Sequence, residues 1–169
     1  SISMPLNNFS FSNFRESLFA AVCMLTGTGY VLADYEIWPV FVQMLLLTLM
    51  FIGGMGGSTT GGMKIIRIML LTKYTTLETR RMLHSRALLP VKIGKQLIQE
   101  DVVRNTLGYF LFFISVFIFA TIFLTSMGLN IETSIGAAAS AMGNIGPALG
   151  DLGPTDNYAF LPNSVKWVL

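Results

Sequence analysis

The sequence predicts an all-α membrane protein with re-entrant half-helices and one broken transmembrane helix. Hydrophobic residues make up 53% of the chain, charged residues only 12%, and the mean hydropathy is +0.63, which is too apolar for an ordinary soluble domain. Two apolar stretches are too short to cross a bilayer. A third stretch, which is long enough, contains six glycines within residues 53–62. These three observations together predict the fold class.

The charged residues are unevenly distributed. Nine of the 11 lysines and arginines lie within residues 64–104, whereas the rest of the chain is acidic. The positive-inside rule therefore predicts that the connection 73–104 is cytoplasmic and that the acidic segments lie outside. Nucleic acid is not an expected partner, because this basic run lies between apolar spans and has almost no aromatic residues for base stacking.

Cysteine and histidine are too few for several kinds of site. One cysteine, Cys23, excludes an internal disulfide, and one histidine, His84, excludes a histidine-rich metal cage. We therefore expect neither an enzyme nor a covalently bound cofactor. The N-terminus lacks the features of a signal peptide and an initiator Met, and the last residues resemble the start of a helix. We expect the chain to be an internal piece of a longer protein.

Residues 14–35 are predicted to form a short helix and a turn. The apolar part, residues 14–25, has the length of a re-entrant helix, and it stops at Thr26-Gly27-Thr28-Gly29. A half-helix followed by a Gly/Thr turn inside a membrane can present backbone carbonyls to an ion in place of its hydration shell. The alternative is an ordinary loop at a helix end.

Residues 36–72 are predicted to be a second helix that breaks at a glycine-rich loop. Each glycine costs about 1 kcal/mol of helix propensity relative to alanine. A broken backbone is tolerated in hydrocarbon only where it is buried in protein or lines a watery cavity. The loop's candidate functional residues are its glycines and hydroxyl residues: Gly53, Gly54, Gly56, Gly57, Ser58, Thr59, Thr60, Gly61 and Gly62.

Three interpretations of this loop compete. A nucleotide-binding loop is excluded, because Met63 separates Gly62 from Lys64. Close helix packing through small residues four apart explains some of the glycines. A flexible loop that obstructs or lines a conduction path explains the adjacent glycine pairs and the hydroxyl residues as well, and we favour it.

Two basic residues follow the loop, Lys64 and Arg67, at a spacing that places them on one helical face. The simpler interpretation is that both side chains reach toward the cytoplasmic interface. The alternative is that Lys64 braces the carbonyls of the loop or tunes cation flux.

The second half of the chain repeats this organisation. Residues 105–128 contain the cleanest span, residues 132–150 form a second short helix with a turn, and residues 151–169 form an outer segment and the start of a helix. A shift of 117 residues places Cys23 on Ser140 and Gly29 on Gly146, which suggests an internal repeat. The second turn, Asn144-Ile145-Gly146, is then the counterpart of the first.

Two motifs carry a family resemblance. The run Gly53-Gly54-x-x-Gly57-Ser58-Thr59-x-Gly61-Gly62-Met63-Lys64-x-x-Arg67 resembles the signature of the TrkH/TrkG/KtrB superfamily of bacterial potassium-uptake proteins, with the TrkH branch closer. The run Asn144-Ile145-Gly146-Pro147-x-x-Gly150 looks like the last pore loop of that superfamily. Such proteins have four tandem helix–pore loop–helix repeats around a single pore, and this chain is similar to parts of the third and fourth repeats.

The resemblance implies a function for each motif. It implies that Gly29 and Gly146 are filter glycines, within the filter segments Thr26, Gly27, Thr28, Gly29 and Asn144, Ile145, Gly146. It also implies that residues 53–62 gate the pore and that Lys64 and Arg67 flank the gate on its cytoplasmic side. The ion held at the filter and transported would be K⁺.

The resemblance further implies partners and a location: a homodimer of the full-length subunit in the bacterial inner membrane, crossing it several times in contact with lipid, and a cytosolic TrkA-like nucleotide-binding ring. The main competing function is a secondary transporter whose broken helices surround a small-molecule site. A purely structural membrane anchor would need neither pore loops nor glycine clusters.

Overall fold

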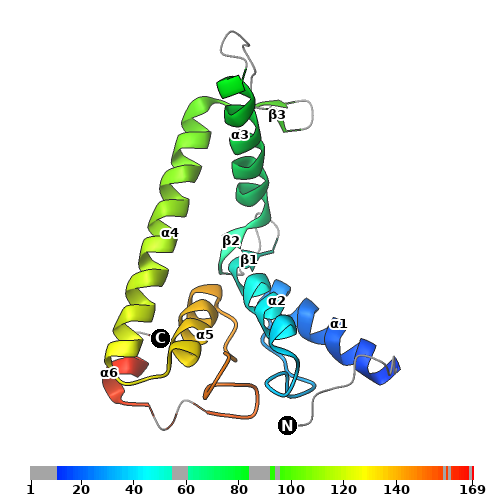
Figure 1. Ribbon diagram of the computed structural model, residues 1–169, viewed down its shortest axis with the longest axis vertical. Helices are drawn as coiled ribbons and strands as arrows, with labels where there is room; N and C mark the ends of the chain where they lie inside the picture. The colour runs from blue at the N-terminus through cyan, green and yellow to red at the C-terminus, as the bar shows by residue number, and fades with distance from the viewer. Residues whose placement is uncertain are drawn as a thin grey trace.

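The computed structural model describes residues 11–54, 61–83, 92–93, 96–157, 159, 161–167 and 169. These residues are mainly helical (Figure 1). The helices are α1 (Phe11–Thr26), α2 (Val40–Phe51), α3 (Ile65–Leu83), α4 (Glu100–Ser126), α5 (Ile131–Gly143) and α6 (Asn163–Lys166). Two-residue strands also form, β1 (Ile52–Gly53) parallel to β2 (Met63–Lys64) and β3 (Lys92–Ile93) antiparallel to β4 (Gln96–Leu97), beside the predominant helices.

The longest helix, α4, has the length and composition of a membrane span. Within the described part of the chain it contains the one helix that qualifies, Asp101–Ser126, with a mean hydropathy of 2.5. At 1.5 Å per residue its 27 residues extend for about 40 Å, which exceeds the thickness of a bilayer's hydrocarbon core. Large apolar side chains such as Phe112 and Phe119 are exposed on its surface, as expected for a helix in contact with lipid or further helices.

Helix α3 lies beside α4, and the two converge at the end of the molecule farthest from α5 (Figure 1). Leu70 and Val103 are buried between them. The Arg67 guanidinium carbon lies 3.9 Å from the centre of the Tyr109 ring, which is a cation–π contact. Helix α3 continues to Leu83, well into the segment predicted to be a connection, because residues 77–83 are mostly strong helix formers.

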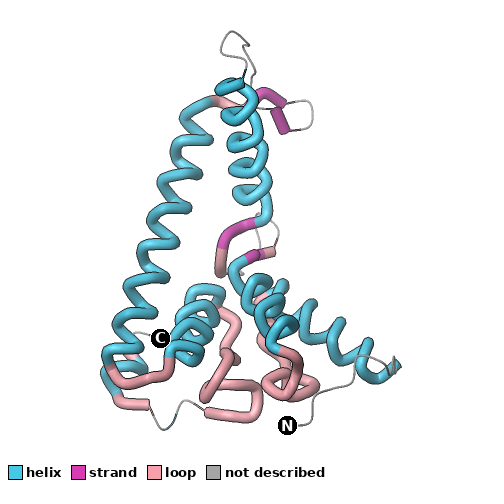
Figure 2. Tube along the Cα trace, viewed as in Figure 1, coloured by secondary structure: helices cyan, strands magenta, loops and turns pink. Residues whose placement is uncertain are grey.

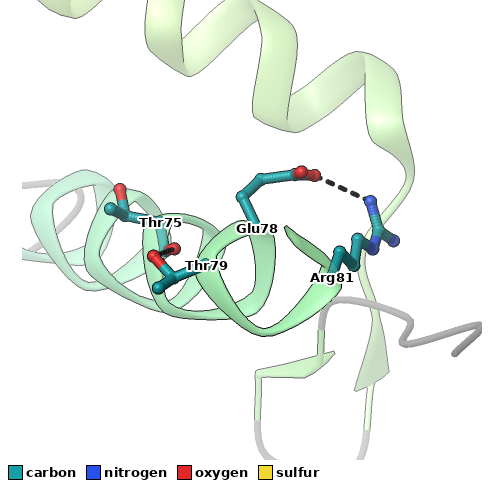
Figure 3. A network of polar contacts seen from close by, with 4 residues as sticks. All are labelled: Thr75, Glu78, Thr79 and Arg81. Carbon is teal, nitrogen blue, oxygen red and sulfur yellow. Dashed lines mark hydrogen bonds and ion pairs between the residues drawn. The ribbon is translucent and has the colours of Figure 1, made fainter. Parts of the chain in front are cut away.

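The end of α3 is polar, and several of its side chains are bonded within the helix (Figure 3). Glu78 and Arg81 form an ion pair of 2.8 Å one turn apart. The hydroxyls of Thr75 and Thr79 donate to backbone carbonyls four residues earlier, each at 2.9 Å. Hydroxyls bonded to the helix's own backbone need no water, which allows this threonine-rich surface to face an apolar environment.

Among the described residues, helix α2 ends at Phe51 and helix α3 begins at Ile65. Between them β1 pairs with β2, Ile52 with Met63 and Gly53 with Lys64. The backbone of Lys64 is used for strand pairing, so Lys64 precedes α3 and does not share the predicted helical face with Arg67. The loop positions Gly56, Gly57, Ser58, Thr59 and Thr60 lie outside the described residues.

The short helices α1, α2 and α5 gather at the other end of the molecule, where most of the loops also lie (Figure 2). One core joins α1, α2 and the segment after α5, through side chains such as Met24, Trp38, Met50 and Ile145. A second core, centred on Leu124, packs α5 and α6 against the end of α4.

Candidate functional site

Helices α1 and α5 end in the same backbone turn. After α1, the N–H of Thr28 donates to the Cys23 carbonyl at 3.1 Å and the N–H of Gly27 donates to the Met24 carbonyl at 3.3 Å. After α5, the corresponding bonds run from Ile145 to Ser140 at 3.0 Å and from Asn144 to Ala141 at 3.2 Å. Both pairs form the Schellman motif, and every residue of one is 117 positions from its counterpart in the other.

Left-handed backbone makes these turns, and the residue types suit it. Gly27 has φ of 65° and Gly29 has φ of 67°. Their counterparts, Asn144 and Gly146, have φ of 54° and 108°. Asparagine is one of the few non-glycine residues that enter this region readily. The repeat suggested by a weak match in sequence is therefore present in backbone geometry.

The structure brings these two turns into contact. A Cβ on Gly29 would overlap the carbonyl oxygen of Ile145 and would lie 3.2 Å from Cδ of Pro147. No side chain fits there, so glycine is required both by its φ and by the approach of the second turn. Thus the turn Thr26–Gly29 lies against the turn Asn144–Gly146, although the two are more than 100 residues apart in the sequence.

Side chains behind the two turns hold their backbone. The N–H of Gly146 donates to the hydroxyl oxygen of Ser140 at 3.1 Å. Ser140 is 1% exposed. In the first turn the Thr26 hydroxyl donates to the Val22 carbonyl at 2.7 Å and lies 3.3 Å from the Thr28 hydroxyl. Ser140 was not predicted as a functional residue, although the 117-residue shift had already paired it with Cys23.

The loop between α1 and α2 is fixed to the segment after α5. The Tyr35 hydroxyl, which is fully buried, donates to the Ala148 carbonyl at 2.9 Å. Asp151 is held by the Thr133 hydroxyl and by the Asn130 side chain, both at 3.2 Å. Asn130 is the N-cap residue of α5, but its side chain makes no capping hydrogen bond and its amide is used for the contact with Asp151 instead.

The described ends of the glycine-rich loop lie against the end of α5. The N–H of Gly62 donates to the Met142 carbonyl at 3.0 Å. A Cβ on Gly61 would lie 2.5 Å from that same carbonyl oxygen, and a Cβ on Gly53 would overlap the Gly61 carbonyl. Close backbone packing therefore accounts for the glycines at these two positions. It also places the loop's far end next to the second turn.

A carboxyl group with one oxygen unpartnered among the described residues lies in the loop between α1 and α2. One carboxylate oxygen of Glu36, in the loop between α1 and α2, is buried without a hydrogen-bond partner in the described structure. Burial, together with the negative charges of Asp34, Asp156, Asp151 and Glu132, raises the pKa of Glu36 to about 7. Among the described residues, no three carboxylate, histidine or cysteine side chains are grouped to hold a metal ion.

Comparison with known proteins identifies similar chains. Residues 10–163 match the family model TrkH, described as a cation transport protein. The sequence is 34% identical over 155 residues to the Trk system potassium uptake protein TrkH of Halomonas elongata, covering 92% of this chain and 32% of that protein. It is 34% identical over 138 residues to the Trk system potassium uptake protein TrkG of Escherichia coli, covering 82% and 28%.

A solved structure is also similar. The crystal structure of the potassium transporter TrkH from Vibrio parahaemolyticus superposes with a TM-score of 0.86 at 34% identity. The match covers 96% of this chain and 34% of that one. The mainly helical fold is thereby confirmed. The chain spans about a third of the length of the relatives it matches.

Proposed function

Because the chain belongs to the TrkH family of cation transport proteins, we propose that it forms part of a potassium-translocating pore. The transported ion is K⁺, held by backbone carbonyls, and no covalently bound cofactor takes part. Relatives named as potassium uptake proteins support this choice of ion. The chain supplies only part of the pore, in keeping with its share of the relatives' length.

The contact between the two turns is the observation that carries the proposal. Ion filters use closely spaced backbone carbonyls at the ends of short helices. Here two short helices end in equivalent turns, and the Gly29 backbone meets the Ile145 carbonyl. We assign Thr26, Gly27, Thr28 and Gly29 to one quarter of the filter and Asn144, Ile145 and Gly146 to another. The remaining carbonyls come from other parts of the full-length protein.

Each of the longer helices is assigned a position in the membrane. Helix α4 crosses the bacterial inner membrane, whereas α1 and α5, with 16 and 13 residues, enter it and turn back as re-entrant half-helices. Helices α2 and α3 form one broken transmembrane helix. The pattern supports a multi-pass subunit in contact with lipid.

The gate in this proposal is the glycine-rich loop, residues 53–62. The hydrogen bond from Gly62 to Met142 supports a position directly next to the second turn. Lys64 and Arg67 flank the gate on the cytoplasmic side. The cation–π contact of Arg67 with Tyr109 joins the start of α3 to α4, which supports a fixed position for the helix that follows the loop.

The basic segment 73–104 is the part of this chain suited to a cytosolic partner. Arg80 and Arg81 lie in the last turn of α3. This end of α3 is the one that meets α4 (Figure 1), and it is predicted to be cytoplasmic. We propose that this end of α3 faces a TrkA-like nucleotide-binding ring and that the full-length subunit is a homodimer.

A secondary transporter with a small-molecule site among broken helices is the weaker alternative, because it does not require two equivalent turns in contact.

The test is Gly29→Ser in the full-length protein. A side chain at this position displaces the second turn, so the variant should insert into the membrane but lose potassium uptake or its preference for K⁺ over Na⁺. Gly108→Ser is the matched control, because a Cβ on Gly108 meets no atom within 4 Å. Growth of an uptake-deficient strain at low potassium is measured for both, with uptake of each ion. Wild-type rate and preference for Gly29→Ser would exclude Gly29 from the filter.

A further inference from the structure

One side chain behind the second turn is bonded to the peptide group that carries a proposed ion ligand. The N–H that donates to Ser140 belongs to the peptide between Ile145 and Gly146. A trans peptide is planar, with its N–H and C=O pointing in opposite directions. The Ser140 bond therefore also fixes the direction of the Ile145 carbonyl, which lies against Gly29.

The surroundings of Ser140 make this bond specific. The side chain is buried on α5, one turn before the helix ends, and its own backbone carbonyl accepts the N–H of Ile145 at 3.0 Å. Ser140 thus binds two successive N–H groups of the turn, one through its backbone and one through its hydroxyl. A buried hydroxyl in this position cannot be exchanged for water without reopening the packing.

The equivalent residue behind the first turn is different. Cys23 occupies the position 117 residues earlier and is also buried. Within the described structure, no hydrogen bond joins its thiol to the N–H of Gly29, and a thiol is a weak acceptor. The two turns share a backbone geometry, but the hydroxyl of Ser140 binds the N–H of Gly146 in the second turn, whereas Cys23 makes no such bond to the equivalent Gly29 in the first, in the part of the chain that the structure describes.

We propose that Ser140 is a positioning residue that sets the ion preference of the pore by holding the Ile145–Gly146 peptide in one orientation. This inference rests on the proposed function, because it assumes that the Ile145 carbonyl faces the ion path. Without the bond, the peptide can rotate and the carbonyl can approach a smaller ion. Na⁺ is then accommodated better while K⁺ is held less well.

The experiment measures the K⁺/Na⁺ uptake ratio of the purified full-length protein in liposomes. A neutral hydrogen bond biases an orientation by about two- to tenfold, so Ser140→Ala should lower the ratio by that factor while uptake continues. Ser140→Cys, which copies the residue already present at position 23, should fall between wild type and Ser140→Ala. If Ser140→Ala does not fold, the uptake ratio of Ser140→Cys alone tests whether Ser140 sets the ion preference.

The control is Ser134→Ala on the same helix, which removes a buried hydroxyl that has no hydrogen-bond partner in the described structure. Its ratio should equal that of wild type. A wild-type ratio for Ser140→Ala, or for Ser140→Cys where Ser140→Ala does not fold, would overturn the role of Ser140. Gly29→Ser in the same assay separates the two proposals. If it changes the ratio when the Ser140 variants do not, the filter stands without the brace; if none of them changes the ratio, the filter assignment also fails.

Discussion

Replacing Gly29 with alanine adds one methyl group at the point where the two turns meet. Gly29 has φ of 67°, and left-handed backbone costs an alanine about 1 kcal/mol. The new Cβ would also overlap the Ile145 carbonyl oxygen and lie 3.1 Å from its carbon. Both atoms belong to backbone, which cannot rotate away as a side chain can. The second turn must move, at a further cost of about 1 kcal/mol or more.

The expected loss follows from these two costs. About 2 kcal/mol of strain relieved by displacing the carbonyls corresponds to roughly 30-fold weaker potassium binding, at 1.4 kcal/mol per tenfold. The assay is the potassium concentration for half-maximal uptake by the reconstituted full-length protein. Gly146→Ala should have a smaller effect, because its φ of 108° adds strain but a Cβ there meets no described atom within 4 Å.

Gly108→Ala is the control, since it adds the same methyl group to an ordinary helical position with open space around it. Its half-saturation should match that of wild type. The reasoning is refuted if Gly29→Ala is indistinguishable from Gly108→Ala in well-folded protein.

Three further predictions concern the proposed gate, the α3–α4 contact and the loop between α1 and α2. Deleting a few residues within 55–60 should raise potassium flux per reconstituted protein and weaken its dependence on the cytosolic partner, because the obstruction is shortened; unchanged or lower flux in folded material would favour helix packing instead. Arg67→Ala alone should cost about 1 kcal/mol of stability in denaturant unfolding, because it removes the cation–π contact with Tyr109. In a protein that already carries Tyr109→Ala, the same substitution should cost little; if the two losses simply add, the cation–π contact is not the cause. Burial and neighbouring carboxylates raise the pKa of Glu36 from 4.5 to about 7, so the folded protein holds this proton more tightly than the unfolded chain does. The stabilisation that the protonated Glu36 contributes is therefore complete below about pH 4.5 and is lost as the pH rises through about 7. Glu36→Gln should flatten the fall in melting temperature between pH 5 and pH 8. An unchanged slope of melting temperature against pH would contradict this.

Local patterns in the sequence predicted the local structure well. The short apolar stretches before Thr26 and Gly143 did become short helices ending in glycine-containing turns, because helix length and turn residues are encoded over a few positions. The end of α2 at Phe51, shortly before Gly53 and Gly54, likewise follows from glycines that disfavour helix.

Contacts between distant residues could not be predicted in this way. Nothing near Arg67 indicates that its partner is Tyr109, and nothing near Gly29 indicates that the Ile145 carbonyl lies against it. The same limit applies to the strand pairing that removes Lys64 from the helical face. Each of these contacts depends on how separate helices pack, which a single chain pattern does not specify.

The residues of the two turns were predictable from the sequence, but the side chain that supports the second turn was not. Glycine positions identified both turns, whereas the brace from Ser140 depends on a hydroxyl that looks, in the sequence, like one more small residue on a packed helix. Nothing in the sequence around Glu36 indicates that one of its carboxylate oxygens is buried. Its burial becomes visible only when the loop is folded against its neighbours.

The central claim is that the two turns bind potassium together. The most direct measurement is a crystal structure of the full-length protein grown with Rb⁺ or Tl⁺ in place of K⁺, with the anomalous signal used to locate the ions. The claim predicts ion density within coordination distance of carbonyls from both Thr26–Gly29 and Asn144–Gly146. Well-ordered turns with no ion between them, together with ions bound elsewhere in the membrane region, would contradict it.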